Sequence, residues 1–258
     1  MKRLMWKVFG LADLLVSAPI YLVVPRHVRN FWMMPGTVMR NQRACDEVRA
    51  VIGGARPARV LDVGGGIAAL SESLSADGAV RVVTLDLDME MLRRARGKIP
   101  GAVLLCADGT RLPFADRTFD AVVMVHALEH IPEPIREKLA SEIKRVTRSG
   151  VVIHGPAGAD AVTLTRRFID RMEARGMEVP RYAREHLEFS MPMPGWFATA
   201  FPGCRVQPHR NLDVELMNLL TAYTPVMRWL GGYRQRRMAA RDEQPPFVEY
   251  TMTWRKAP

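Results

Sequence analysis

Residues 60–70 read VLDVGGGIAAL, and this stretch decides the fold. It begins as a short apolar strand, passes through three consecutive glycines and continues into a helical pattern. Glycine lets the backbone turn tightly and approach a ligand closely, and the free N–H groups at the start of the following helix can bind one. Asp62, which comes before the glycines in the strand, strengthens the prediction of a nucleotide-type binding loop.

The alternation of strands and helices continues along the chain. Several expected strands are continuously apolar, which favours a mostly parallel sheet covered on both faces and therefore an α/β fold. The sequence predicts strands at 59–63, 80–85, 102–106, 121–125, 151–154, 205–208 and 247–254. It predicts helices at 38–52, 68–74, 89–98, 134–146, 161–175 and 214–230, and a loop at 177–195.

Composition is ordinary for a globular protein except in its charge. The chain has 37 basic and 27 acidic residues and a net charge of +10, which favours anionic partners unless it reflects an Arg-rich proteome. The three cysteines, Cys45, Cys106 and Cys204, form no CxxC pair. We therefore expect neither a disulfide framework nor a metal site, and a cytoplasmic location.

The N-terminal part contains an apolar run, residues 8–24, between basic flanks. Asp13 and Pro19 disfavour a spanning helix, and no small-residue cleavage site follows that would indicate a signal peptide. Two interpretations remain: a helix that packs on the domain and caps its site, or an amphipathic helix that places residues 1–30 on the anionic inner face of the membrane. We expect residues 1–56 to form a helical extension and 57–258 the main domain.

Two acidic residues extend the predicted site beyond the glycine loop. Asp86 ends the second predicted strand 24 residues after Asp62, about where a carboxylate accepts hydrogen bonds from ribose hydroxyls. Asp108 follows the third predicted strand. The loop itself reads GGGIAA over residues 64–69, which departs from the GxGxxG pattern of a dinucleotide-phosphate loop.

Residues 58 to about 156 resemble the class I S-adenosylmethionine-dependent methyltransferases, in the branch that acts on small molecules. The resemblance rests on the glycine loop, Asp86, Asp108-Gly109 and the turn Leu128-Glu129-His130-Ile131, in the family's order. It implies a Rossmann-like, doubly wound, mostly parallel seven-stranded sheet with an antiparallel last strand. It also implies S-adenosylmethionine as cofactor and substrate-pocket insertions at about 157–203 and 211–245.

The resemblance assigns roles at the cofactor site. Asp62 and the backbone of Gly64, Gly65 and Gly66 would hold the amino and carboxylate groups of the methionine moiety. Ala68 stands where the family commonly has a third glycine.

The remaining roles concern the nucleoside. Asp86 would bind the ribose hydroxyls, with Leu87 beside the adenine. Asp108 would accept a hydrogen bond from the adenine amino group, with Gly109 beside it. After the fourth strand, Val125 and His126 would close the site.

Methyl transfer needs alignment and exclusion of water more than acid–base help. The candidate catalytic residues are His126, His154 and His186, each of which could act as a base near neutral pH. His126 and His130 also fit an HxxEH zinc-protease pattern, but that pattern requires a helix and here it directly follows a predicted strand.

We expect methyl transfer to a hydroxyl, carboxyl or amine of a small, lipid-like or membrane-held molecule. The net charge and the arginines at 234–241 would also suit a tRNA or rRNA methyltransferase, although the Asn/Asp-Pro-Pro-aromatic turn of amino-methylating enzymes is missing after the fourth strand. A third alternative is a fold that binds the cofactor without catalysis. A homodimer is the default expectation for the assembly.

Overall fold

The computed structural model describes residues 35–54, 57–76, 78–96, 103–222, 241 and 243–257. The chain divides into two compact units. The sheet unit comprises residues 40–158, 189–208 and 249–258, and the helical unit comprises 1–39, 159–188 and 209–248. The expected membrane-binding or capping segment at 8–24, and Arg234, Arg236 and Arg237, lie outside the described residues.

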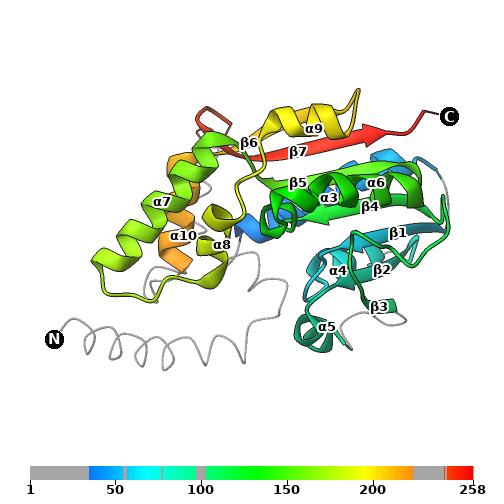
Figure 1. Cartoon of the computed structure of the whole chain (residues 1–258), viewed down its shortest axis with the longest axis horizontal. Helices are drawn as coiled ribbons and strands as arrows, with labels where there is room; N and C mark the ends of the chain where they lie inside the picture. Colours follow the sequence, from blue (N-terminus) through cyan, green and yellow to red (C-terminus); the bar gives the residue numbers. More distant parts are fainter. Residues whose placement is uncertain are drawn as a thin grey trace. The chain divides into compact units, whose positions relative to one another are not determined.

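Seven strands form one sheet in the order β3-β2-β1-β4-β5-β7-β6, and Figure 1 shows β3 through β5 side by side. All neighbouring pairs from β3 to β5 are parallel, whereas β7 is antiparallel to β5. The Rossmann-like order and the antiparallel last strand that the sequence predicts are thereby confirmed. The strands are β1 (Ala58–Val63), β2 (Val80–Asp86), β3 (Val103–Cys106), β4 (Phe119–Val125), β5 (Thr147–Pro156), β6 (Arg205–Asn211) and β7 (Phe247–Arg255).

Successive residues of the central strands face opposite sides of the sheet, as the period of two requires. On β4, Val122 and Met124 enter one apolar core, and Ala121 and Val123 enter the other. The first core is covered by α6 (Arg136–Val146) and α9 (Pro194–Ala200), and the second by α3 (Pro35–Ile52) and α4 (Ala69–Ser75). The continuous apolar runs thus reflect burial on both faces.

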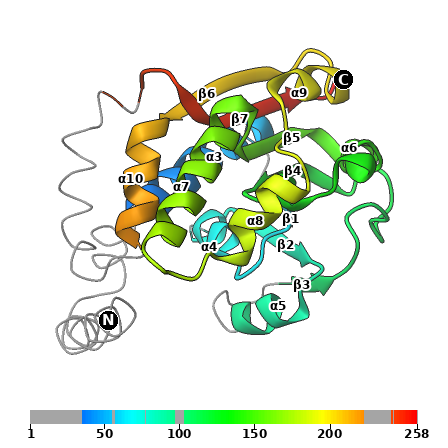
Figure 2. The same cartoon turned by 60° about the vertical axis from the view of Figure 1, so that its left-hand side comes forward.

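Two short segments complete the sheet unit. Figures 1 and 2 both show α5 (Met89–Ala95) beside β3 at one edge of the sheet. Two 3₁₀ turns, η1 (Leu128–His130) and η2 (Glu133–Ile135), connect β4 to α6. The predicted helix at 89–98 ends sooner, at Ala95, and the predicted strand at 151–154 is longer in both directions.

The helical unit contains α8 (Arg181–Glu188), α10 (Leu212–Ala222) and most of α7 (Gly158–Ala174). The prediction of a loop over 177–195 is wrong, because this stretch contains α8 and the start of α9. Its prolines lie where helices tolerate them: Pro180 precedes α8, and Pro194 opens α9. None of the described helices is both long and apolar enough to span a bilayer.

Candidate functional site

The strand order reverses between β1 and β4, which both pair in parallel with their outer neighbours. In open α/β sheets the crevice at the carboxyl ends of such strands is the usual ligand site. The glycine loop follows β1 there, and His126 follows β4. The sheet therefore brings together the two predicted segments that are about 60 residues apart in the chain.

The glycine loop is held by backbone hydrogen bonds from its own N–H groups. Gly64 and Gly65 donate to the carbonyl of Leu85 at 2.8 and 3.2 Å, and Gly66 donates to Oδ2 of Asp86 at 2.8 Å. Gly64 has a φ of +71°, and a Cβ there would come within 2.5 Å of the Cβ of Ala127. The loop is thus fixed against the ends of β2 and β4 before any ligand contact is considered.

Asp62 lies beneath this loop and is 1% exposed. Oγ of Ser71 on α4 donates to Oδ2 of Asp62 at 2.6 Å and also lies 2.7 Å from Oγ1 of Thr84. Burial raises the pKa of the Asp62 carboxyl to about 6. In this geometry Asp62 supports the loop from behind, and its direct contact with a methionine moiety stays a prediction.

Ala68 stands where the family commonly has a glycine, and its backbone conformation is one that glycine adopts more easily. Its backbone is left-handed, with φ 60° and ψ 31°, at the start of α4, and its methyl group is fully buried. The extra methyl therefore fits sterically, but an L-residue other than glycine costs about 1 kcal/mol in this conformation. The glycine that the family commonly has at this position would avoid that cost.

We expect Ala68→Gly to leave the stability within about 1 kcal/mol, because relief of the left-handed strain offsets the loss of a buried methyl group. Affinity for S-adenosylmethionine should stay the same or rise, since the loop keeps its backbone path. Urea unfolding and calorimetric titration measure the two quantities. A tenfold loss of affinity would show that the methyl group itself holds the loop in place.

The carboxyl group of Asp86 joins the two loops at the carboxyl ends of β1 and β2. It accepts from Gly66 N, as above, and its Oδ1 accepts from the N–H of Asp88 at 2.8 Å. Leu87, the next residue, is 67% exposed, which is unusual for so large an apolar side chain. A carboxylate with lone pairs to spare beside an open apolar surface matches the predicted ribose and adenine contacts.

Asp108 lies in the connection between β3 and β4. Both of its oxygens accept from Thr110, from the N–H and from Oγ1, each at 2.8 Å, and these hydrogen bonds lower the pKa of the carboxyl. A Cβ on the next residue, Gly109, would come within 2.9 Å of Leu139 on α6. The connection therefore packs tightly on α6 and presents an ionised carboxylate.

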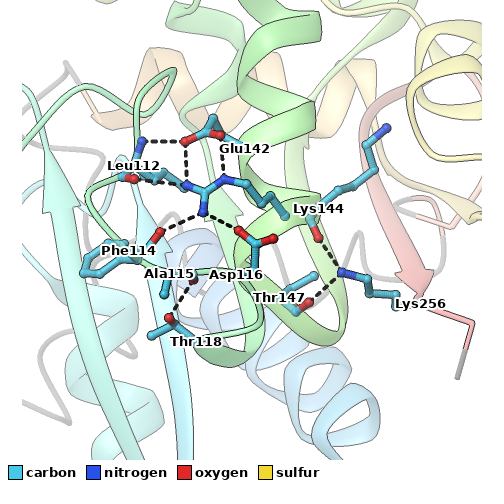
Figure 3. A network of polar contacts seen from close by, with 10 residues as sticks. Leu112, Phe114, Ala115, Asp116, Thr118, Glu142, Lys144, Thr147 and Lys256 are labelled. Atoms are coloured by element: carbon cyan, nitrogen blue, oxygen red, sulfur yellow. Dashed lines mark hydrogen bonds and ion pairs between the residues drawn. The ribbon is translucent and has the colours of Figure 1, made fainter.

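A guanidinium anchors the same connection further on (Figure 3). Arg145 on α6 donates to the carbonyls of Leu112 and Phe114, at 3.1 and 2.7 Å, and forms ion pairs with Asp116 and Glu142. Glu142 also accepts from the N–H of Leu112 at 2.8 Å, as Figure 3 shows. The loop that carries Asp108 is consequently tied to a core helix at four points.

Ionisable side chains cluster at the carboxyl ends of β4 and β5. Nε2 of His126 lies 3.3 Å from Oε1 of Glu249, and Nε2 of His154 lies 3.4 Å from Oε2 of Glu249. Nδ1 of His154 lies 2.8 Å from Oγ1 of Thr251. The strand register explains the arrangement, because Val125 pairs with His154, and His154 pairs with Thr251 on β7.

Only part of this cluster can be reached from outside. The side chains of Glu129, His154 and Glu249 are at most 4% exposed, whereas that of His126 is 25% exposed. Val125, which precedes His126, is half-buried. His126 is therefore the member of the cluster that a ligand can meet, and its backbone has a positive φ of 50°, a strained conformation that often marks functional sites.

Arg40 on α3 lies over the imidazole ring of His126. Its Nη1 is 3.1 Å from Nε2 and 3.3 Å from Nδ1. An atom that is nearly equidistant from both ring nitrogens at this range cannot lie in the ring plane, because it would there collide with Cε1. It must therefore lie over the face of the ring. The contact is therefore a stacked cation, which leaves the in-plane lone pair of the neutral imidazole available.

Burial and the Arg40 cation lower the pKa of His126 to about 3, and burial also lowers the pKa of His154. Burial raises the pKa of Glu129 to about 8. Both imidazoles are thus neutral at pH 7, and Glu129 carries its proton.

Glu129→Gln should make the protein less sensitive to alkaline pH. The folded-state pKa of Glu129, about 8, lies above its ordinary value of 4.5, so its contribution to stability is complete below pH 4.5 and is lost as the pH rises toward 8. We expect the stability of the variant relative to the wild type to rise by about 2–3 kcal/mol between pH 6 and pH 9. Urea unfolding at both pH values measures this. Equal stability differences at the two pH values would mean that Glu129 is ionised throughout.

Two candidates for this cluster escaped the sequence analysis. Arg40 lies on α3, which is separated from the glycine loop by β1. Glu249 lies within a strand that the sequence predicts at 247–254. No local pattern marks either residue; only the pairing of β7 with β5 brings Glu249 to His154. The donor atoms of His126, His154 and Glu249 lie within 4.8 Å of one another, a set that could bind a divalent cation, but the Arg40 cation already faces His126.

The third histidine, His186, lies on α8 in the helical unit. Its ring centroid is 5.8 Å from that of Tyr182, one turn earlier on the same helix. Its predicted catalytic role stays a prediction. The other predicted residues, from Asp62 to Val125, all belong to the sheet unit.

Comparison with known proteins identifies the domain. Residues 61–154 match the model of the family described as "Methyltransferase domain". The match begins in β1 and ends within β5, so it contains the glycine loop, Asp86, Asp108 and the turn after β4. In this part the chain is similar to a methyltransferase domain.

Among curated proteins, the chain is similar to several demethylmenaquinone methyltransferases. The chain is 38% identical over 137 residues to the demethylmenaquinone methyltransferase of Renibacterium salmoninarum, which covers 52% of this chain and 55% of the relative. It is 40% identical over 98 residues to the enzyme of that name from Beutenbergia cavernae, 38% of this chain and 40% of the relative. The chain thus spans about half the length of the curated relatives that it matches.

Solved structures show the same fold at low identity. A mycolic acid cyclopropane synthase complexed with S-adenosylhomocysteine is 17% identical with a TM-score of 0.56, covering 85% of this chain and 84% of that chain. The phosphoethanolamine N-methyltransferase 2 of Haemonchus contortus is 16% identical with a TM-score of 0.55, covering 84% of this chain and 52% of that chain.

Proposed function

We propose that the protein transfers a methyl group from S-adenosylmethionine to a small, lipid-like acceptor. The observation that carries this proposal is the convergence of the glycine loop, Asp86 and Asp108 at the carboxyl ends of β1, β2 and β3, where the strand order reverses. The demethylmenaquinone methyltransferases among the relatives support an acceptor of the isoprenoid-quinol kind.

The residues present fit the cofactor. At Gly65 a Cβ would come within 2.6 Å of Asp62 and 2.5 Å of Thr84, so the backbone can lie close to the strand ends only because a side chain is missing. Asp86 and Leu87 would hold the ribose and adenine, and Asp108 would accept from the adenine amino group. The cofactor supplies the methyl group on a sulfonium, which is already a good leaving group. The loop orients it, and the buried strand ends exclude water.

Calorimetric titration with S-adenosylmethionine and S-adenosylhomocysteine tests the cofactor part. We expect binding in the micromolar range, and a loss of tenfold or more in Asp86→Ala, because the two ribose hydroxyls would lose their acceptor. Glu90→Ala is the control, since Glu90 is an exposed carboxylate four residues further on. The absence of binding at high micromolar concentration would remove the proposal.

Transfer of labelled methyl to a short-chain demethylmenaquinol tests the acceptor part. Product formation that requires the wild-type chain would support the quinol class. If the cofactor binds but a panel of quinols stays unlabelled, the acceptor part is wrong and the methyltransferase part stands.

We further propose that residues 1–30 bind an anionic membrane surface, because a lipid-like acceptor would be found there. Flotation with vesicles of phosphatidylglycerol and phosphatidylcholine, using the full chain and a chain that lacks residues 1–30, tests this. Equal failure of both chains to float would remove the membrane part.

A further inference from the structure

We propose that Arg40, His126 and Glu249 form an acceptor-activating site, and that the acceptor reacts through an acidic hydroxyl, such as a phenol or an enol, which is deprotonated there. This inference rests on the proposed methyl transfer and adds the chemical class of the acceptor. Its basis is the juxtaposition of one cation, one accessible imidazole and one buried carboxyl group within a single cluster.

Glu249 fixes which nitrogen of His126 can act as the base. Because Oε1 of Glu249 lies 3.3 Å from Nε2 of His126, the hydrogen-bond network favours the tautomer that carries its proton on Nε2. The lone pair then lies on Nδ1. The neighbour on that side is the protonated carboxyl group of Glu129, whose Oε1 is 3.5 Å from Nδ1, longer than a normal hydrogen bond. Nδ1 is therefore open to an acceptor hydroxyl, in the manner of a base oriented by a carboxylate.

The proton transfer balances within the site. The acceptor O–H bond breaks, a bond from its hydrogen to Nδ1 of His126 forms, and the electron pair stays on oxygen. That oxygen, or the ring carbon conjugated with it, then attacks the methyl carbon as the bond from carbon to sulfur breaks. For attack through carbon, the ring then loses its own proton to restore conjugation. The proton on His126 leaves to solvent, to which the side chain is partly open.

The net charge of the cluster favours a hydroxyl acceptor over an amine acceptor. After proton transfer the site contains the Arg40 and His126 cations together with the acceptor oxyanion and the Glu249 carboxylate, which sum to zero. Methylation of an amine acceptor would add a positive charge and leave the same groups with a net charge of +1, with the new cation facing Arg40. Within the described part of the chain the buried Nε of Arg40 has no hydrogen-bond acceptor, so the positive charge of the guanidinium is not offset at that atom.

The ionisable groups around His126 come from four elements. Arg40 lies on α3, Glu129 on η1, His154 on β5 and Glu249 on β7, and Arg43 on α3 acts on His154. Arg40 opposes protonation of His126 and Glu249 favours it, consistent with the causes of its lowered pKa. An acceptor oxyanion would cancel the effect of Arg40, so His126 becomes a stronger base when the hydroxyl acceptor is bound.

The test uses 4-nitrophenol, whose anion absorbs visible light, added to the full chain saturated with S-adenosylhomocysteine. In the wild type we expect the bound phenol to ionise at a pH at least one unit lower than in solution. Arg40→Met should abolish that shift, and Arg49→Met, on the same helix but half-exposed beside Asp46, should keep it. The isosteric 4-nitroaniline, which does not ionise, should bind the wild type and Arg40→Met equally.

Glu249→Gln provides a second readout. It should bind S-adenosylhomocysteine as the wild type does, while methyl transfer to a quinol falls at least tenfold in kcat and its pH profile moves to lower pH, because Glu249 raises the pKa of His126. An unshifted nitrophenol in the wild type, or a shift that survives Arg40→Met, overturns the proposal while calorimetry shows the cofactor site intact. Failure of S-adenosylhomocysteine to bind the wild type would instead overturn the proposed function, and this inference with it.

Discussion

Gly65→Ala is expected to lower the free energy of unfolding by about 2–3 kcal/mol and to weaken S-adenosylmethionine binding at least tenfold. The added Cβ would come within 2.5 Å of Cγ2 of Thr84 and 2.6 Å of Oδ2 of Asp62, closer than real Cβ contacts approach. Both neighbours are buried, and Asp62 is bonded to Ser71, so neither can move aside cheaply. The loop must therefore lift away from the strand ends.

Urea unfolding and calorimetric titration measure the two effects. Gly54→Ala is the matched control, because a Cβ there meets nothing within 4 Å, and it should change stability by less than about 0.5 kcal/mol. If Gly65→Ala behaves like this control, the loop does not pack on Asp62 and Thr84 as described.

Arg136→Met is expected to lower the stability by about 2–4 kcal/mol. Arg136 is 3% exposed, and its guanidinium donates to three backbone carbonyls: Ile131 at 2.9 Å, Phe189 at 2.9 Å, and Ser190. Methionine fills a similar volume but donates nothing, so three carbonyl groups lose their partner in a buried setting.

Arg148→Met is the control for Arg136. Arg148 is half-exposed and makes a single surface pair with Asp120 at 3.3 Å, which should contribute less than about 0.5 kcal/mol. Chemical unfolding of both variants and the wild type gives the comparison. A loss of under 1 kcal/mol in Arg136→Met would show that water replaces the guanidinium at those carbonyls.

The sheet was predictable because its strands are short apolar runs that end in marked loops. β1, β2 and β4 lie within two residues of their expected limits, since burial on both faces leaves a strong signal in the sequence. The stretch 177–195 was misread because three prolines suggested a loop, although two of them lie just before or at the start of helices.

The candidate site also contains residues that the sequence predicts and residues that only the structure shows. The glycine loop, Asp86 and Asp108 follow strands in chain order, so local patterns predict them. Arg40 and Glu249 come from opposite ends of the chain, and only strand pairing and helix packing bring them to His126. Likewise, the sequence showed that Ala68 departs from the family, but only the φ of 60° shows that the cost is backbone strain.

The last strand of the sheet along the chain is β7 (Phe247–Arg255), whereas the first begins at Ala58. A ribosome therefore completes every cofactor loop well before it adds Glu249. A nascent chain, or one cut by a protease after residue 245, would retain the loops that bind the cofactor and lack the carboxyl group that orients His126. Methyl transfer would then require the strand that contains Glu249, so a chain without that strand could hold the methyl donor and not transfer the methyl group.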